Sequence, residues 1–176
     1  MTTTSRRFLV CAFLSFVSVL FFTSCRRAAS DASGLVTQSE IEKIVGTNVT
    51  GTTIEAKHAV SMAGSRVMHS TSSCVYSLNA NPGKPARIKI SLDTYDDLRM
   101  MMFDFTSWKG AEKVSGIGDA AWQDTTALEI LNKKQILVIE TDETSESPKE
   151  PIPPSDETRA YPGIQTAVAK IALGRL

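Results

Sequence analysis

The chain has 176 residues, 42% of them hydrophobic and 22% charged, which fits one globular domain preceded by a leader segment. Its 19 Lys and Arg residues balance 19 Asp and Glu residues, so no basic surface is available to neutralise nucleic-acid phosphates. The three cysteines, Cys11, Cys25 and Cys74, form neither a CxxC pair nor the even set of a disulfide framework.

The first predicted element is a signal peptide over residues 1–24. Arg6 and Arg7 precede an uncharged apolar run over residues 8–22, "FLVCAFLSFVSVLFF". This run is about 15 residues long, whereas a membrane span needs about 20. A positive start followed by a short apolar run therefore predicts export and cleavage.

The end of this run, "FTSC", resembles the lipobox of bacterial lipoproteins, although Phe22 stands where Leu is usual. The resemblance implies that the signal peptide is cut before Cys25 and that the Cys25 thiol receives lipid. Residues 25–34 would then form a flexible tether of small and polar residues. An uncleaved signal anchor and plain secretion after cleavage elsewhere are the alternatives.

A single domain is predicted over residues 35–176, beginning with a helix over 38–45. Thr37 and Glu40 form a capping box, and Gly46 supplies a helix stop. The β-branched residues of 49–60 predict a strand.

The next segments predict a loop, a hairpin and a second helix. Residues 61–72, "SMAGSRVMHSTS", show no periodicity and predict the loop. Strands over 73–78 and 87–95 flank turn formers, and the second strand alternates apolar with polar residues. Helical spacing of apolar residues over 94–110 predicts an amphipathic helix.

A meander and a third helix complete the chain. Short apolar segments over 120–124, 127–132 and 135–142 predict three antiparallel strands. Residues 142–160, rich in Pro, Ser and acids, predict a mobile loop, and Pro162 begins an amphipathic helix. The predicted fold is α+β, with one antiparallel sheet of about five or six strands packed against two or three helices. The predicted order is helix, strands, helix, strands, helix.

Four short segments carry a second resemblance: "IEKIVG", "CVY" at 74–76, "GIGDAA" at 116–121 and the C-terminal "AVAKIALGRL". Together they are similar to small exported bacterial lipoproteins of uncharacterised function, over roughly residues 35–176. The resemblance implies a fold and a location in the envelope, and it supplies no catalytic residue. This chain departs from the family pattern by its single domain cysteine and its long acidic, Pro-rich loop.

The sequence favours a protein that is not an enzyme and has no cofactor. No GxSxG, HExxH or Ser-x-x-Lys motif stands in a fitting context. The segment Gly116–Asp119 precedes a strand and lacks the third Gly and the Lys of phosphate-binding loops. We expect these glycines to permit positive φ and Asp119 to cap the turn.

Two weaker site predictions concern metal and thiol chemistry. Imidazole and thioether groups suit copper(I), and four such residues fall within a short segment: His58, Met62, Met68 and His69. The alternative is a loop whose methionines fill gaps against the sheet. Cys74 is predicted either as an inert buried thiol or as a partner in an intermolecular disulfide.

The function predicted from these features is a membrane-anchored envelope lipoprotein whose domain is a binding or structural module. Its expected partners are the membrane, through lipid on Cys25, and an envelope protein or a small apolar ligand. The expected location is the outer membrane or the periplasmic face in a Gram-negative cell, and the cell surface otherwise. An alternative is a carrier that holds an apolar ligand between helices and sheet, lined by Met101, Phe105 and Trp122.

Overall fold

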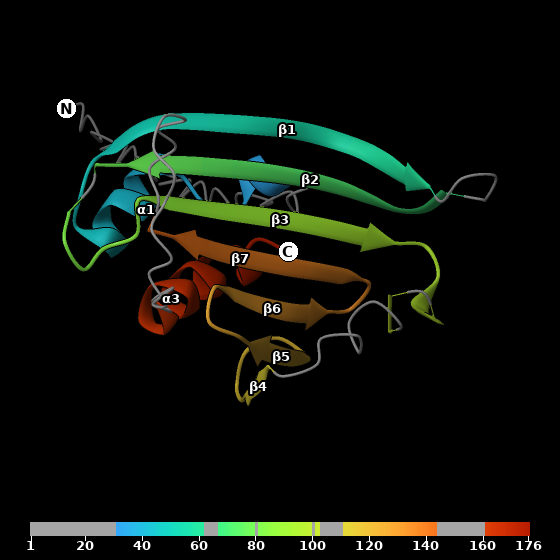
Figure 1. Ribbon diagram of the computed structural model, residues 1–176. Coiled ribbons are helices and arrows are strands. Elements are labelled where there is room, and N and C mark those ends of the chain that lie inside the picture. Colours follow the sequence, from blue (N-terminus) through green and yellow to red (C-terminus); the bar gives the residue numbers. More distant parts are fainter. Residues whose placement is uncertain (1–30, 62–66, 80, 100, 103–110, 144–160) are drawn as a thin grey trace, which may run out of the picture.

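The computed structural model describes residues 31–61, 67–79, 81–99, 101–102, 111–143 and 161–176. One antiparallel sheet of seven strands dominates them, in the order β1-β2-β3-β7-β6-β5-β4 (Figure 1). The strands are β1 (Val49–Ser61), β2 (Val67–Leu78), β3 (Arg87–Tyr95), β4 (Glu112–Val114), β5 (Ala120–Gln123), β6 (Ala127–Asn132) and β7 (Gln135–Asp142).

Three helical elements pack against one face of this sheet: η1 (Ala32–Gly34), α1 (Gln38–Val45) and α3 (Pro162–Leu173). The predicted caps of α1 are present. The Thr37 backbone N–H donates to Glu40 Oε2 at 2.8 Å, and Gly46 ends the helix at φ +69°.

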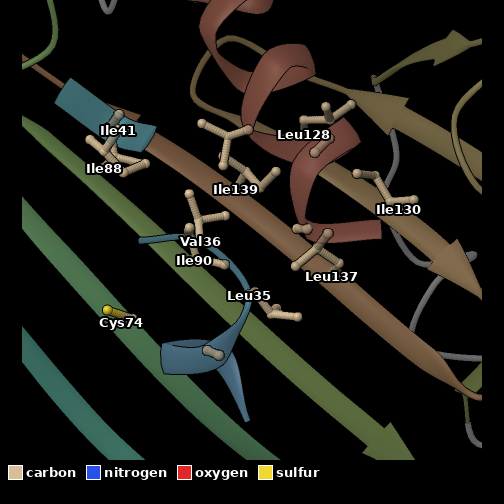
Figure 2. Packing of buried hydrophobic residues seen from close by; sticks show 14 of the residues in the cluster. Leu35, Val36, Ile41, Cys74, Ile88, Ile90, Leu128, Ile130, Leu137 and Ile139 are labelled. Carbon is tan, nitrogen blue, oxygen red and sulfur yellow. The ribbon is translucent and has the colours of Figure 1, made fainter. Parts of the chain in front are cut away.

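Alternation along the central strands builds the core between sheet and helices. In β3, Ile90 and Leu92 are buried and lie opposite Ile139 and Leu137 of β7. Figure 2 shows Ile90, Leu137 and Ile139 near Leu35 and Val36 of the N-terminal segment. Because side chains alternate between the faces of a strand, the intervening residues of β3 face away from the helices.

The predicted number of strands and order of elements are wrong. The sheet has seven strands, and the described residues contain only two α-helices. Of the expected middle helix, residues 98, 99, 101 and 102 are helical, and residues 103–110 lie outside the described part.

The length of β2 and the number of strands were wrong for separate reasons. Residues 67–72 have no periodicity and were predicted as a loop, yet they extend β2 along β1, and from His69 onward also along β3, through main-chain hydrogen bonds. β4 is three residues long, too short to show any periodicity.

The domain begins earlier than predicted. Residues 31–34, expected in the flexible tether, are ordered as η1 and its N-cap Asp31. Ala32 is fully buried, and its backbone N–H donates to Ser72 Oγ at 2.9 Å. The signal peptide, Cys25 and residues 144–160 of the expected mobile loop lie outside the described residues.

Candidate functional site

The far end of the β1–β2 hairpin combines an exposed edge strand with both histidines of the chain. We call residues 55–61 and 67–73 the β1–β2 arm. It extends past the helices, which lie toward the opposite end of these strands (Figure 1). β1 is an edge strand that pairs only with β2, and its residues 50–59 are all exposed.

An irregularity in β1 brings both histidines of the chain to one face of the arm. Glu55 pairs with Ser73 and His58 with Thr71, so two residues of β1 oppose Ser72 alone. This β-bulge shifts the alternation by one residue. His58 therefore faces the same side as Thr71, and His69, which lies opposite Val60, faces that side too.

The two imidazoles are consequently diagonal neighbours on adjacent antiparallel strands. Without the bulge, His58 would lie opposite Ser70 and face away from His69. Ser72 faces the helical side of the sheet, because its Oγ accepts from the Ala32 backbone N–H. Side chains alternate along a strand, so Thr71 and the two histidines face away from α1 and α3.

Local contacts orient both rings. The His69 ring stacks on Tyr95 of β3, with centroids 4.8 Å apart and an interplanar angle of 26°. His69 Nδ1 is buried and has no hydrogen-bond partner among the described residues. The exposed His58 places its Nδ1 3.2 Å from the Ala56 carbonyl oxygen.

Two carboxylates lie near this pair on the same face. Glu55 of β1 pairs with Ser73, and its Oε2 accepts from Ser73 Oγ at 2.8 Å. Asp93 of β3 pairs with Thr71, which makes it a diagonal neighbour of His69. No group of three or more His, Cys, Asp or Glu side chains suited to one metal ion occurs in the described part of the chain. On this face the arm therefore offers two imidazoles and the Glu55 carboxylate as possible metal-binding groups.

The structure brings together two of the four residues predicted for copper. Met68 lies in β2 immediately before His69. Met62 lies outside the described residues. His58 and His69 are thus the two predicted copper ligands that strand pairing places on one face.

Cys74 lies on the helix-facing side of β2, where it is a free thiol with 1% of its surface exposed. Burial raises the pKa of this thiol, and burial also raises the pKa of the neighbouring Tyr76 hydroxyl, which donates to the Val36 carbonyl. A second chain cannot reach Cys74 in the folded protein, so its position favours the inert thiol over the intermolecular disulfide.

Two of the three residues predicted to line a carrier cavity pack in one apolar cluster. Met101, which lies in the helical residues after β3, is buried with Tyr95 and Ile136, and Trp122 packs against this cluster. Ile136 immediately precedes the core residue Leu137, so the cluster occupies the face of the sheet opposite α1 and α3. Phe105 lies outside the described residues, and the carrier stays a prediction.

The positive φ expected at the glycines of the Gly116–Asp119 segment is confirmed. The Gly116–Asp119 segment is a turn with φ +79° at Gly116 and +59° at Gly118, and Asp119 Oδ2 accepts from the Lys133 backbone N–H at 2.7 Å. Glu129, which the sequence analysis did not single out, is 3% exposed beside Trp122 and Val138. A charged residue within the apolar segment "ALEILN" was the sequence signal that could have identified it as buried.

No family model, curated protein or solved structure matches the chain. Among the described residues, none of the helices has the length and apolar character needed to span a membrane. Function is therefore inferred from the residues of the chain itself.

Proposed function

We propose that the protein is a bacterial envelope lipoprotein, held to a membrane by lipid on Cys25, whose domain is a binding module and not an enzyme. The supporting observation is the position of Asp31 and Ala32, where the described part of the chain begins. Asp31 caps η1, and Ala32 is packed in the core. Cleavage before Cys25 would leave this whole domain intact.

The distance between anchor and domain is short. Six residue steps separate Cys25 from Asp31, and an extended chain spans at most about 3.3–3.6 Å per residue. The ordered domain would thus lie within about 20 Å of the lipidated residue. Arg26 and Arg27 fall in this interval, where each contributes about 1 kcal/mol of attraction to an anionic bilayer.

Lipid attachment at Cys25 would give stable anchoring. A diacylglyceryl group supplies two acyl chains, and each buried methylene contributes about 0.8 kcal/mol. One chain alone binds a membrane reversibly, whereas two chains retain a protein there. The signal peptide would then be needed for export only.

The edge strand β1 supports the binding role. Its 13 residues pair on one side only, and its side chains from 50 to 59 are exposed. The main-chain N–H and C=O groups along such an edge can pair with an extended segment of another protein. The opposite edge, β4, is only three residues long and offers little length for pairing.

Lipidation is tested by metabolic labelling with an alkyne fatty acid in a bacterial host. We expect label on the wild-type chain and on Cys74→Ala, and no label on Cys25→Ser. Cys74→Ala is the matched control because it removes the buried cysteine of the domain. Label retained by Cys25→Ser, or absent from the wild type, would contradict lipidation at Cys25.

The binding role is tested by photocrosslinking in intact cells. A photoreactive residue at Thr53, exposed in β1, should give a discrete adduct with an envelope protein. The same residue at Gly163, exposed in α3, is the control and should give none. No adduct from Thr53, or the same adduct from both positions, would contradict recognition through the β1 edge.

A further inference from the structure

We propose that His58 and His69 together bind one divalent transition-metal ion, Zn²⁺ or Cu²⁺, on the face of the β1–β2 arm that is turned away from α1 and α3. The inference goes beyond the proposed membrane anchoring and does not depend on it. It rests on the placement of the two imidazoles and on the contacts that orient them.

The placement is specific because the chain contains only two histidines. They lie on different strands, and only the bulge between Glu55 and His58 turns both to the same face. A β-bulge re-aims side chains, and bulges are found next to functional sites more often than elsewhere. Here its effect is to make the two imidazoles of the chain neighbours.

The separation of the two positions suits a shared ion. Diagonal neighbours on antiparallel strands lie about 7–8 Å apart at their Cα atoms, and their Cβ atoms lie somewhat closer. A ring nitrogen ligates Zn²⁺ at about 2.0–2.1 Å. From such positions, two imidazoles can reach one ion between them when both side chains turn toward it.

The contacts of His58 match those of a metal ligand. Metal-binding histidines usually donate the N–H of their second ring nitrogen to a backbone carbonyl or a carboxylate. The Nδ1 of His58 lies 3.2 Å from the Ala56 carbonyl oxygen, so its N–H can donate there. Nε2 then carries the lone pair that coordinates the ion.

His69 is held for the same role by packing. Stacking on Tyr95 restricts rotation of its ring. Its Nδ1 is buried without a hydrogen-bond partner in the described part of the chain, which is a cost in free energy. A buried polar atom of this kind needs a reason, and holding an imidazole in a coordinating position supplies one.

The character of the site follows from its ligands. Imidazole nitrogen suits Zn²⁺ and Cu²⁺ and does not suit Ca²⁺ or Mg²⁺, which prefer oxygen. Asp93, the diagonal neighbour of His69 on the other side, adds a negative charge close to the ion. Two protein ligands leave positions for water, so we expect a site that exchanges its ion with solvent.

The test uses NMR of the full chain in detergent, because two histidines give only two sets of imidazole signals. On titration with Zn²⁺ at pH 7.5, we expect both sets to change together and to saturate at one ion per chain. His58→Gln and His69→Gln should each weaken binding at least tenfold. Glu112→Gln, which alters an exposed carboxylate on the opposite edge strand β4, should bind as the wild type does.

Three results would overturn the proposal: change in only one imidazole, saturation at two independent ions, or no Zn²⁺-induced change in either imidazole. His58 is exposed, so His58→Gln keeps the test decisive even where His69→Gln disturbs the Tyr95 packing. Circular dichroism of each variant verifies its folding. Cu²⁺ titration monitored by electron paramagnetic resonance should show two nitrogen ligands in the wild type and one in either single variant.

Discussion

Arg175 donates two hydrogen bonds to Glu40, with Nη2–Oε1 at 2.8 Å and Nη1–Oε2 at 3.0 Å, although the residues are 135 positions apart in the chain. Arg175 Nη1 also donates to the Leu35 carbonyl oxygen at 2.7 Å. The contact joins the end of α3 to the beginning of α1 and to the segment after η1. It thereby connects α1 with α3, which contact each other on the same face of the sheet.

The first prediction concerns pH. Burial raises the pKa of Glu40, but hydrogen bonds from Thr37 and Arg175 outweigh it and lower the pKa from 4.5 to about 2. Stability from this group is therefore complete above pH 4.5 and is lost as pH falls toward 2. Because the pair is partly exposed, we expect a loss of about 1–2 kcal/mol in the free energy of unfolding.

Denaturant unfolding between pH 6 and 2 measures this loss. Glu40→Gln should be less stable than the wild type at pH 6, and the difference should shrink toward pH 2. Glu112→Gln, an exposed carboxylate in β4, serves as the control and should follow the wild type. A constant difference between Glu40→Gln and the wild type across this range would contradict the role of the ionised carboxylate.

The second prediction concerns Gly118. Its φ is +59°, and an added Cβ would lie 2.5 Å from the Leu131 carbonyl oxygen and 2.5 Å from Ile130 Cγ2. We expect Gly118→Ala to cost at least about 2 kcal/mol in unfolding free energy. Gly163→Ala in α3 is the matched control, because nothing lies within 4 Å of its added Cβ. The control should be neutral or gain up to about 1 kcal/mol. Equal effects of the two substitutions in thermal denaturation would contradict the geometry of this turn.

The third prediction concerns Gln165, a fully buried polar residue of α3. Its Nε2 donates to the Thr126 carbonyl oxygen at 2.8 Å, and its Oε1 accepts from Gln123 Nε2 at 2.7 Å. Gln165→Leu leaves these polar groups without their partner, at a cost of about 1–3 kcal/mol. Gln38→Leu, an exposed change in α1, should alter unfolding free energy by less than about 0.5 kcal/mol. A stability of Gln165→Leu equal to that of the wild type would show that α3 does not depend on these hydrogen bonds.

The fourth prediction concerns Cys74. The thiol is buried and its pKa is raised by burial, so a water-soluble alkylating reagent should modify it only after unfolding. Mass spectrometry of the folded and urea-unfolded chain measures the modified fraction over time. Modification of Cys74 in the folded protein as fast as in the unfolded one would contradict this burial, as would a dimer whose disulfide is mapped to Cys74.

Local sequence patterns were sufficient to predict some elements of the fold. The capping box at Thr37 and Glu40 predicted a helix over 38–45, and α1 has these bounds. The alternation of apolar residues over 87–95 likewise predicted β3. The positive φ values at Gly116 and Gly118 follow from the residue type.

Other features depend on contacts that no local pattern reveals. The β2 residues 67–72 have no periodicity, and they are strand because they pair with β1 and, from His69 onward, with β3. The bulge that aligns His58 with His69 is set by the register of two strands, so spacing in the sequence could not predict it. The burial of Ala32 against Ser72 depends on a neighbour 40 residues away, and for that reason the tether was predicted too long.

The central claim is that Cys25 is the lipidated N-terminus of the mature protein. The most direct measurement is the mass of the N-terminal peptide from membrane-extracted protein. The account predicts a peptide that begins at Cys25 and carries a diacylglyceryl group. A peptide with residues 6–25 intact, or an unmodified N-terminus at another residue, would contradict it.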